Sequence, residues 1–131
     1  MLRATYNESQ RELLVDGCRE DYERLRDAVR QSLVSGSELA IRVLSAGPTV
    51  VTHLVVRRST LPNRVSHESG RIILEVAPSL HEQFLSFIDF PTDTDLPNSP
   101  IQYHHHYDGL SDDGTYVALD SLPVIIGLER V

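Results

Sequence analysis

The chain has 131 residues with a formal net charge of −7, and all 12 of its basic residues other than histidine are arginine. The absence of lysine excludes a Schiff-base lysine and the lysine of a P-loop. A single cysteine cannot form an intramolecular disulfide, and no segment approaches the roughly 20 consecutive apolar residues of a membrane span. The N-terminal sequence MLRATYNESQRELL also lacks the apolar region of a signal peptide. We therefore expect a soluble cytoplasmic protein that does not bind membranes.

Charge is divided unevenly along the chain. Residues 1–66 carry 10 arginines and 8 acidic residues, whereas residues 67–131 carry 2 arginines and 11 acidic residues. The acidic half would repel the phosphates of a nucleic acid, and it would attract a basic protein partner. Solubility alone is the other interpretation of this charge, and composition leaves both open.

The first half of the chain predicts the order strand, helix, strand, strand. The strands are the apolar or β-branched runs at 12–16, 39–44 and 49–58. The last two are expected to form a hairpin, because Gly47-Pro48 between them is a turn signal. Residues 18–34 follow the 3.6-residue period of a helix that ends near Gly36. Its apolar stripe consists of Tyr22, Leu25, Val29 and Leu33.

The second half predicts the same order of elements. Its expected strands are 71–77, 101–108 and 122–130. The helix between the first two is expected to begin at a capping box formed by Ser79 and Glu82 and to end before Pro91. Its inward residues are predicted to be Leu80, Phe84, Leu85 and Ile88.

These elements predict an α+β fold in one domain spanning residues 1–131. The economical arrangement is a mainly antiparallel sheet of about six strands with two helices on one face. The repeated order of elements suggests that residues 11–58 and 70–130 are duplicated units. Residues 59–70 would then be the linker between them.

The most distinctive segment is SPIQYHHHYDGLSDD, residues 99–113. Side chains alternate between the two faces of a strand. One face would hold Ile101, Tyr103, His105 and Tyr107, and the other would hold Gln102, His104, His106 and Asp108. The first set is largely apolar and is predicted to face the core, with His105 partly buried and hydrogen-bonded. The second set is polar and is predicted to face outward.

The outward set is a candidate metal site. Two histidines at i and i+2 of a strand lie about 6.5 Å apart at Cα, and the imidazoles can reach one metal ion, to which Asp108 would add an oxygen ligand. The pattern is similar to the H-x-H-x-D-H motif of metallo-β-lactamase-like hydrolases, but Gly109 stands where that motif has its last histidine. We expect no metal or cofactor, and a small metal-dependent hydrolase using His104, His106 and Asp108 is the alternative.

Other catalytic arrangements have weaker support. Cys18 lies at the start of the first helix, where a nucleophile would have a lowered pKa, but no histidine is near it in sequence to activate it. Asp112 and Asp113 lie between two glycines and are typical of a turn. We therefore expect no catalytic residue in this chain.

Residues 70–130 resemble the bacterial toxin-immunity family called immunity protein 32. The resemblance is carried by the segment RIILEVAPSLHEQFLSFI, by His104, His106 and Asp108, and by DSLPVIIGLER with its Ser121. Pro123 inside the closing strand departs from a plain strand pattern. The resemblance implies a small α+β cytoplasmic protein without enzymatic activity, which neutralises a co-encoded toxin by binding it.

Our functional expectation is a non-enzymatic protein-binding domain of the immunity type, whose partner is a basic toxin domain. Histidine and tyrosine combine apolar faces with polar tips, and aromatic residues are enriched at interfaces. The predicted partner-binding residues are Tyr103, His104, His106, Asp108, Asp112 and Asp113. A domain that forms a homodimer through a half-exposed sheet is a further alternative.

Overall fold

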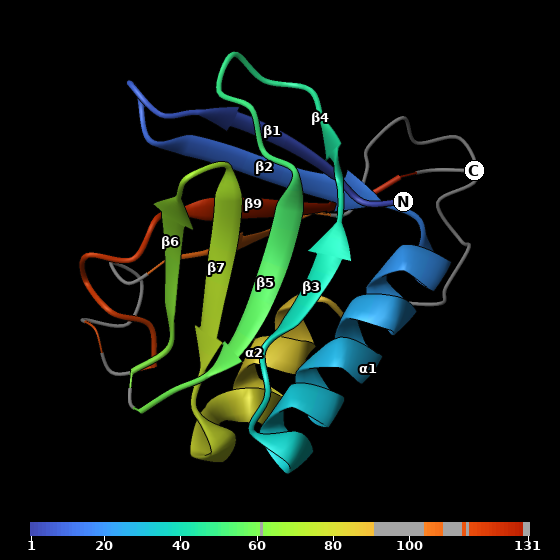
Figure 1. Ribbon diagram of the computed structural model, residues 1–131, viewed down its shortest axis with the longest axis vertical. Coiled ribbons are helices and arrows are strands. Elements are labelled where there is room, and N and C mark those ends of the chain that lie inside the picture. The colour runs from blue at the N-terminus through green and yellow to red at the C-terminus, as the bar shows by residue number, and fades with distance from the viewer. Residues whose placement is uncertain (61, 91–103, 109–113, 115, 130–131) are drawn as a thin grey trace.

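The structure, a computed structural model, describes residues 1–60, 62–90, 104–108, 114 and 116–129, and it describes His104 by its backbone alone (Figure 1). These residues form two sheets that cross one another, with two helices packed against them (Figure 1). The helices are α1 (Arg19–Ser35) and α2 (His81–Phe87), the latter preceded by the short 3-10 helix η1 (Pro78–Leu80). No helix among these residues is long and apolar enough to cross a membrane.

The five-stranded sheet has the order β4-β1-β2-β9-β8. Its strands are β4 (Leu44–Ser45), β1 (Arg3–Asn7), β2 (Glu12–Gly17), β9 (Val124–Leu128) and β8 (His104–Tyr107). The four-stranded sheet has the order β3-β5-β7-β6. Its strands are β3 (Leu39–Arg42), β5 (His53–Arg58), β7 (Arg71–Val76) and β6 (Arg64–Glu68).

Each sheet combines strands from both halves of the chain. The hairpin β1–β2 joins the antiparallel pair β8–β9 through a parallel contact between β2 and β9. In the same way, the hairpin β6–β7 joins the antiparallel pair β3–β5 through a parallel contact between β7 and β5. Both halves of the chain therefore have the order hairpin, helix, strand pair. The strand pair of each half joins the sheet that contains the hairpin of the other half.

The predicted α+β class is confirmed, but the single mainly antiparallel sheet is wrong. The described residues form nine strands in two mixed sheets, because the pairs β1–β4, β2–β9 and β5–β7 are parallel. The periodicity of a strand shows which of its residues are buried but not which strand lies beside it. Sequence reasoning also missed β1 and β6, from which only Ala4, Tyr6 and Val65 join the core.

The segment 59–70 is not a linker, since it contains β6 and the turn of the hairpin β6–β7. Glu68 pairs with Arg71, and the two residues between them, Ser69 and Gly70, have φ values of 48° and 78°. Positive φ at both positions is the signature of a two-residue turn that matches the twist of the flanking strands. Strands of the two suggested units, 11–58 and 70–130, pair with each other in both sheets.

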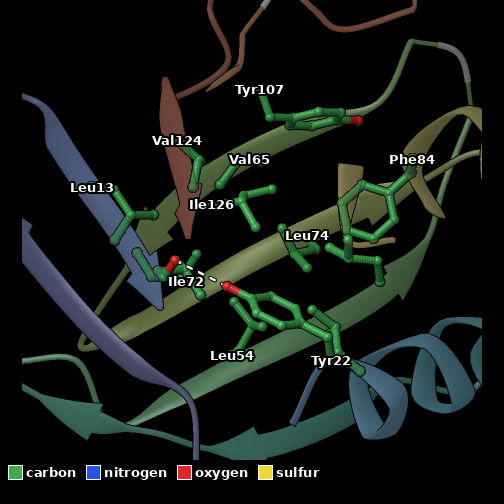
Figure 2. A pocket seen from close by; sticks show the side chains of 13 residues that line it. Leu13, Tyr22, Leu54, Val65, Ile72, Leu74, Phe84, Tyr107, Val124 and Ile126 are labelled. Carbon is green, nitrogen blue, oxygen red and sulfur yellow. Dashed lines mark hydrogen bonds between the residues drawn. The ribbon is translucent and has the colours of Figure 1, made fainter. Parts of the chain in front are cut away.

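The core lies between the two sheets and the helices, and Figure 2 shows its centre. Leu13 and Val124 from the five-stranded sheet face Leu54, Ile72 and Leu74 from the four-stranded sheet. The cavity that these side chains enclose measures only about 20 Å³. That volume is close to the minimum needed for a single water molecule, so the interior is packed core and not a ligand pocket.

Helix α1 begins and ends as its sequence predicts, but α2 does not. Cys18 is the N-cap of α1, its backbone N–H donates to Asp21 Oδ2 at 3.1 Å, and Gly36 ends the helix with φ of 75°. The Ser79–Glu82 capping box expected for α2 is wrong. Pro78 begins a 3-10 turn there, and the Leu80 N–H donates to the Ala77 carbonyl instead.

Candidate functional site

The histidine strand β8 alternates its side chains as predicted. His105 and Tyr107 pair with the buried residues Ile126 and Val124 of β9, whereas His106 pairs with the exposed Ile125. His105 Nδ1 lies 2.8 Å from the Phe87 carbonyl oxygen. The prediction that His105 is a partly buried, hydrogen-bonded histidine is therefore confirmed.

Aromatic residues in α2 and just after it pack against the inner side of β8. The His105 ring stacks on Phe90 with centroids 4.8 Å apart, and Phe87 meets Tyr107 edge-on with centroids 4.9 Å apart. Tyr107 is 1% exposed, and Asn63 Nδ2 donates a hydrogen bond to its hydroxyl oxygen at 3.2 Å. These contacts fix the strand, so the outward position of His106 is set by packing on the opposite face.

The outer face of the five-stranded sheet carries one row of paired residues across four strands. Thr5 of β1 pairs with Leu14 of β2, Leu14 pairs with Ile125 of β9, and Ile125 pairs with His106 of β8. This row borders a depression of about 510 Å³, which we call the outer-face hollow. It is lined by Thr5, Asn7, Arg11, Glu12, Leu13, Leu14, His106, Asp108, Pro123, Val124 and Ile125.

The outer-face hollow combines apolar and charged groups. Leu14 is half-buried and Ile125 is 39% exposed, so the middle of the row offers apolar surface to solvent. Glu12 and Asp108 supply carboxylates, and Arg11 supplies a guanidinium that donates to the Asp120 carbonyl at 3.2 Å. Such a surface, apolar in the middle and polar around it, has the make-up of a protein interface.

An ion-pair network orders the other end of the same face. Arg3 of β1 donates to both carboxylate oxygens of Asp16 on the neighbouring β2, at 3.0 and 2.7 Å, and to Glu129 at 3.1 Å. Asp16 is 6% exposed, and the fork geometry of the guanidinium matches its carboxylate. The network ties β1, β2 and the end of β9 together, which limits distortion of the face.

The structure brings together two of the residues predicted to bind a partner. His106 and Asp108 both line the outer-face hollow. His104 lies on β8 with its side chain outside the described atoms, and Tyr103, Asp112 and Asp113 lie outside the described residues.

Sequence reasoning missed the contribution of the N-terminal hairpin to this surface. Its lining residues come from β1, β2 and the turn between them: Thr5, Asn7, Arg11, Glu12 and Leu14. The alternation along 12–16 was sufficient to place Glu12 and Leu14 on the face opposite Leu13 and Val15. No pattern in the sequence indicated that this strand would lie parallel to the last one.

Within the described part of the chain, no three histidine, cysteine, aspartate or glutamate side chains are grouped so that they could hold a metal ion. His104, one of the three residues of the H-x-H-x-D pattern, contributes no described side chain. Cys18 donates its thiol hydrogen to Asp21 Oδ2 at 3.2 Å, within the cap of α1. Its position is explained by helix capping.

No protein-family model matches the chain, and a search of curated proteins finds no match. The resemblance to immunity protein 32 therefore remains a proposal.

Proposed function

We propose that this protein is a non-enzymatic binding domain of the immunity type, which neutralises a cognate bacterial toxin by docking it on the outer-face hollow. One observation carries the proposal. His106 and Asp108, from the segment that resembles immunity protein 32, lie beside Leu14 and Ile125 on one face of the sheet.

The composition of the hollow supports protein binding over small-molecule turnover. Small-molecule sites are mostly enclosed, and they bury most of the ligand surface. Here most of the lining residues lie on the outer side of a sheet whose inner side forms the core. An exposed isoleucine flanked by a histidine and an aspartate can be desolvated by a complementary protein surface, and such central apolar contacts dominate binding free energies.

Charge supports a basic partner. The hollow carries the carboxylates of Glu12 and Asp108 against one guanidinium, that of Arg11, and Asp112 and Asp113 follow closely in the sequence. Opposite charge accelerates association and makes it sensitive to salt. Many nuclease toxins have basic surfaces because their substrate is a polyanion, which fits this choice of partner.

The rigidity of the surface also supports this role. The strands β1, β2, β9 and β8 are joined by continuous ladders, and β8 is held from inside by Phe87, Phe90 and Asn63. Preorganised interfaces lose little conformational entropy when the partner binds. A surface of this kind suits tight inhibition.

The proposal is tested with the protein encoded by the gene beside this one, using isothermal titration calorimetry. Ile125→Asp places a charge in the middle of the hollow and is expected to weaken binding by at least about tenfold, the equivalent of 1.4 kcal/mol. Val34→Asp is the matched control, because Val34 is 88% exposed on α1, and it is expected to leave affinity unchanged. Equal affinities for Ile125→Asp and the unmodified protein would exclude the hollow as the docking surface.

The electrostatic part of the proposal has its own variants. Asp108→Asn, alone and together with Asp112→Asn and Asp113→Asn, is expected to lower the association rate and flatten its salt dependence. Asp27→Asn on the exposed surface of α1 is the control for removal of one negative charge. A neighbouring gene whose product is acidic or enzymatically unrelated to toxins would contradict the immunity assignment.

Metal analysis separates the proposal from the hydrolase alternative. The protein is purified without chelators and its zinc content is measured. Stoichiometric zinc that is lost in both His104→Ala and His106→Ala would favour a metal-dependent enzyme. Full neutralising activity at a zinc content far below stoichiometric is the result that the binding proposal predicts.

A further inference from the structure

The outer face of the four-stranded sheet carries a row of basic side chains. Arg42 of β3 pairs with His53 of β5, and His53 pairs with Arg71 of β7, so all three project from the same face on adjacent strands. The neighbours Ile41, Leu54 and Ile72 project into the core from the opposite face, which confirms that the row faces outward. Figure 1 shows these three strands side by side.

The two guanidinium groups of the row have no partner in the described part of the chain. Of the arginines described there, only Arg30, Arg42 and Arg71 lack both an ion pair and a side-chain hydrogen bond. Two of these three therefore flank one histidine. Arg42 on β3 and Arg71 on β7 stand on either side of His53, and within the described residues no ion pair neutralises either guanidinium.

The hydrogen bonds of His53 leave one ring nitrogen available. His53 Nδ1 lies 2.9 Å from Thr52 Oγ1, and the Thr52 hydroxyl donates to the Gly70 carbonyl at 3.3 Å. Because the hydroxyl proton is used on that carbonyl, Oγ1 accepts a hydrogen bond from Nδ1–H. Nε2 is then free for a ligand, and in the imidazolium form it donates a hydrogen bond.

The fold itself does not require positive charge at this position. The inward row of the four-stranded sheet is Ile72–Leu54–Ile41, and the residues next to it along the three strands are Arg71, His53 and Arg42. The corresponding inward row of the five-stranded sheet is Leu13–Val124–Tyr107, and it is adjoined by Glu12, Pro123 and Asp108. Two sheets of the same construction thus carry opposite charge at the same place.

We propose that Arg42, His53 and Arg71 form a binding site for a tetrahedral oxyanion of the phosphate class. Adjacent strands are about 4.8 Å apart, so the two arginine Cα atoms lie roughly 10 Å apart, and their long side chains can converge on one anion above the imidazole. Guanidinium groups offer forked donors that match phosphate oxygens. The site is independent of the proposed docking surface, which lies on the other sheet.

Acidic side chains balance the arginines of this face, but within the described residues none of them forms an ion pair with Arg42 or Arg71. On the same face, Arg57 is paired with Glu38 at 2.6 Å and Arg64 with Asp120 at 3.0 Å. Glu75 lies between Arg57 and Arg64 in the strand register, and Glu68 is the cross-strand neighbour of Arg71 but forms no ion pair with it.

The test is an NMR titration with sodium sulfate at constant ionic strength. The amide signals of Arg42, His53 and Arg71 are expected to shift in a saturable way. Arg42→Gln and Arg71→Gln are each expected to weaken binding at least tenfold, whereas Arg30→Gln, the third unpartnered arginine, leaves it unchanged. His53→Gln is expected to weaken binding less than either arginine variant.

Two controls complete the test. A folded spectrum outside the row shows that each variant is intact. Equal shifts in all variants, or the same shifts with sodium chloride, would reduce the effect to general screening and overturn the site.

The natural source of the phosphate group is distinguished by comparing two probes. O-phosphoserine that binds more tightly than inorganic phosphate indicates a covalently carried phosphate group, and the reverse order indicates free phosphate. Failure of either probe to compete with sulfate would contradict the assignment to the phosphate class.

Discussion

Asn63 and Tyr107 are joined by a buried hydrogen bond, in which the Asn63 side-chain amide donates to the tyrosine hydroxyl at 3.2 Å. Asn63 is fully buried, and its side-chain oxygen accepts a hydrogen bond from the Ala77 backbone N–H at 2.7 Å. Its own backbone bonds to the segment that contains Tyr116 and Ala118. One side chain thus connects the four-stranded sheet to the histidine strand of the five-stranded sheet.

Asn63→Ala is expected to reduce the free energy of unfolding by about 2–3 kcal/mol, since it leaves a buried N–H without an acceptor and a buried hydroxyl without this donor. Urea denaturation measures the change, and Gln31→Ala on the exposed surface of α1 is the control. Tyr107→Phe removes the hydroxyl but keeps the hydrogen bond between Ala77 and Asn63, and it is expected to cost less. A loss below about 0.5 kcal/mol for Asn63→Ala, typical of surface substitutions, would show that the junction is not structural.

Tyr22 predicts a dependence of stability on alkaline pH. Its hydroxyl contacts the carbonyl oxygens of Val15 at 3.1 Å and Gly127 at 2.5 Å, and Figure 2 shows the first of these contacts. Burial raises the pKa of Tyr22 above its ordinary value, because the phenolate would lose its hydration. The neutral hydroxyl therefore contributes stability below about pH 10, and this contribution is lost as the pH rises toward the raised pKa.

The measurement compares the unmodified protein with Tyr22→Phe in urea at several pH values. At pH 7 the variant is expected to be less stable by about 1–2 kcal/mol. The difference in the free energy of unfolding between the two proteins should narrow above pH 10, because only the unmodified protein is then destabilised by the burial of an ionisable phenol. A difference that stays constant up to the alkaline limit would disprove this role of the hydroxyl.

Asp21 predicts the opposite behaviour in acid. Burial disfavours its ionisation, but hydrogen bonds from the Met1 amino group and from the thiol and N–H of Cys18 outweigh burial and lower the pKa of this carboxyl. Its contribution to stability is complete above the ordinary aspartate pKa near 4 and disappears as the pH falls below it. Asp21→Asn should be less stable at neutral pH and less sensitive to acid, whereas Asp27→Asn on the same helix should change neither property.

Gly47 and Gly127 provide a matched pair for testing backbone contact. A Cβ atom at Gly47 would lie 2.3 Å from the Tyr6 carbonyl oxygen, whereas one at Gly127 would meet its nearest neighbour at 3.6 Å. Gly47→Ala must therefore separate the 46–49 segment from β1, and overpacking of this kind costs about 1–3 kcal/mol or more. Gly127→Ala is expected to be nearly neutral, and equal effects in thermal denaturation would contradict the contact.

Much of the local structure was readable from the sequence. The apolar period of 18–34 predicted α1, with Tyr22, Leu25 and Val29 buried, and the alternation in 71–77 predicted which residues of β7 face the core. The same alternation separated His105 from His106. These predictions held because each depends only on the geometry of one element, which repeats along the chain.

The tertiary structure alone decided how those elements combine. No local pattern indicated that β2 would pair with β9 or that β7 would pair with β5. The first pair joins residues more than a hundred positions apart, and the second joins the two halves of the chain. Both pairs form through backbone groups that every residue has, so side-chain patterns do not specify them. That pairing brings Leu14 beside Ile125 and His106, and it places His53 between Arg42 and Arg71. The sequence by itself determined which side of each strand is polar, and the parallel contacts between the two halves determined which polar sides meet.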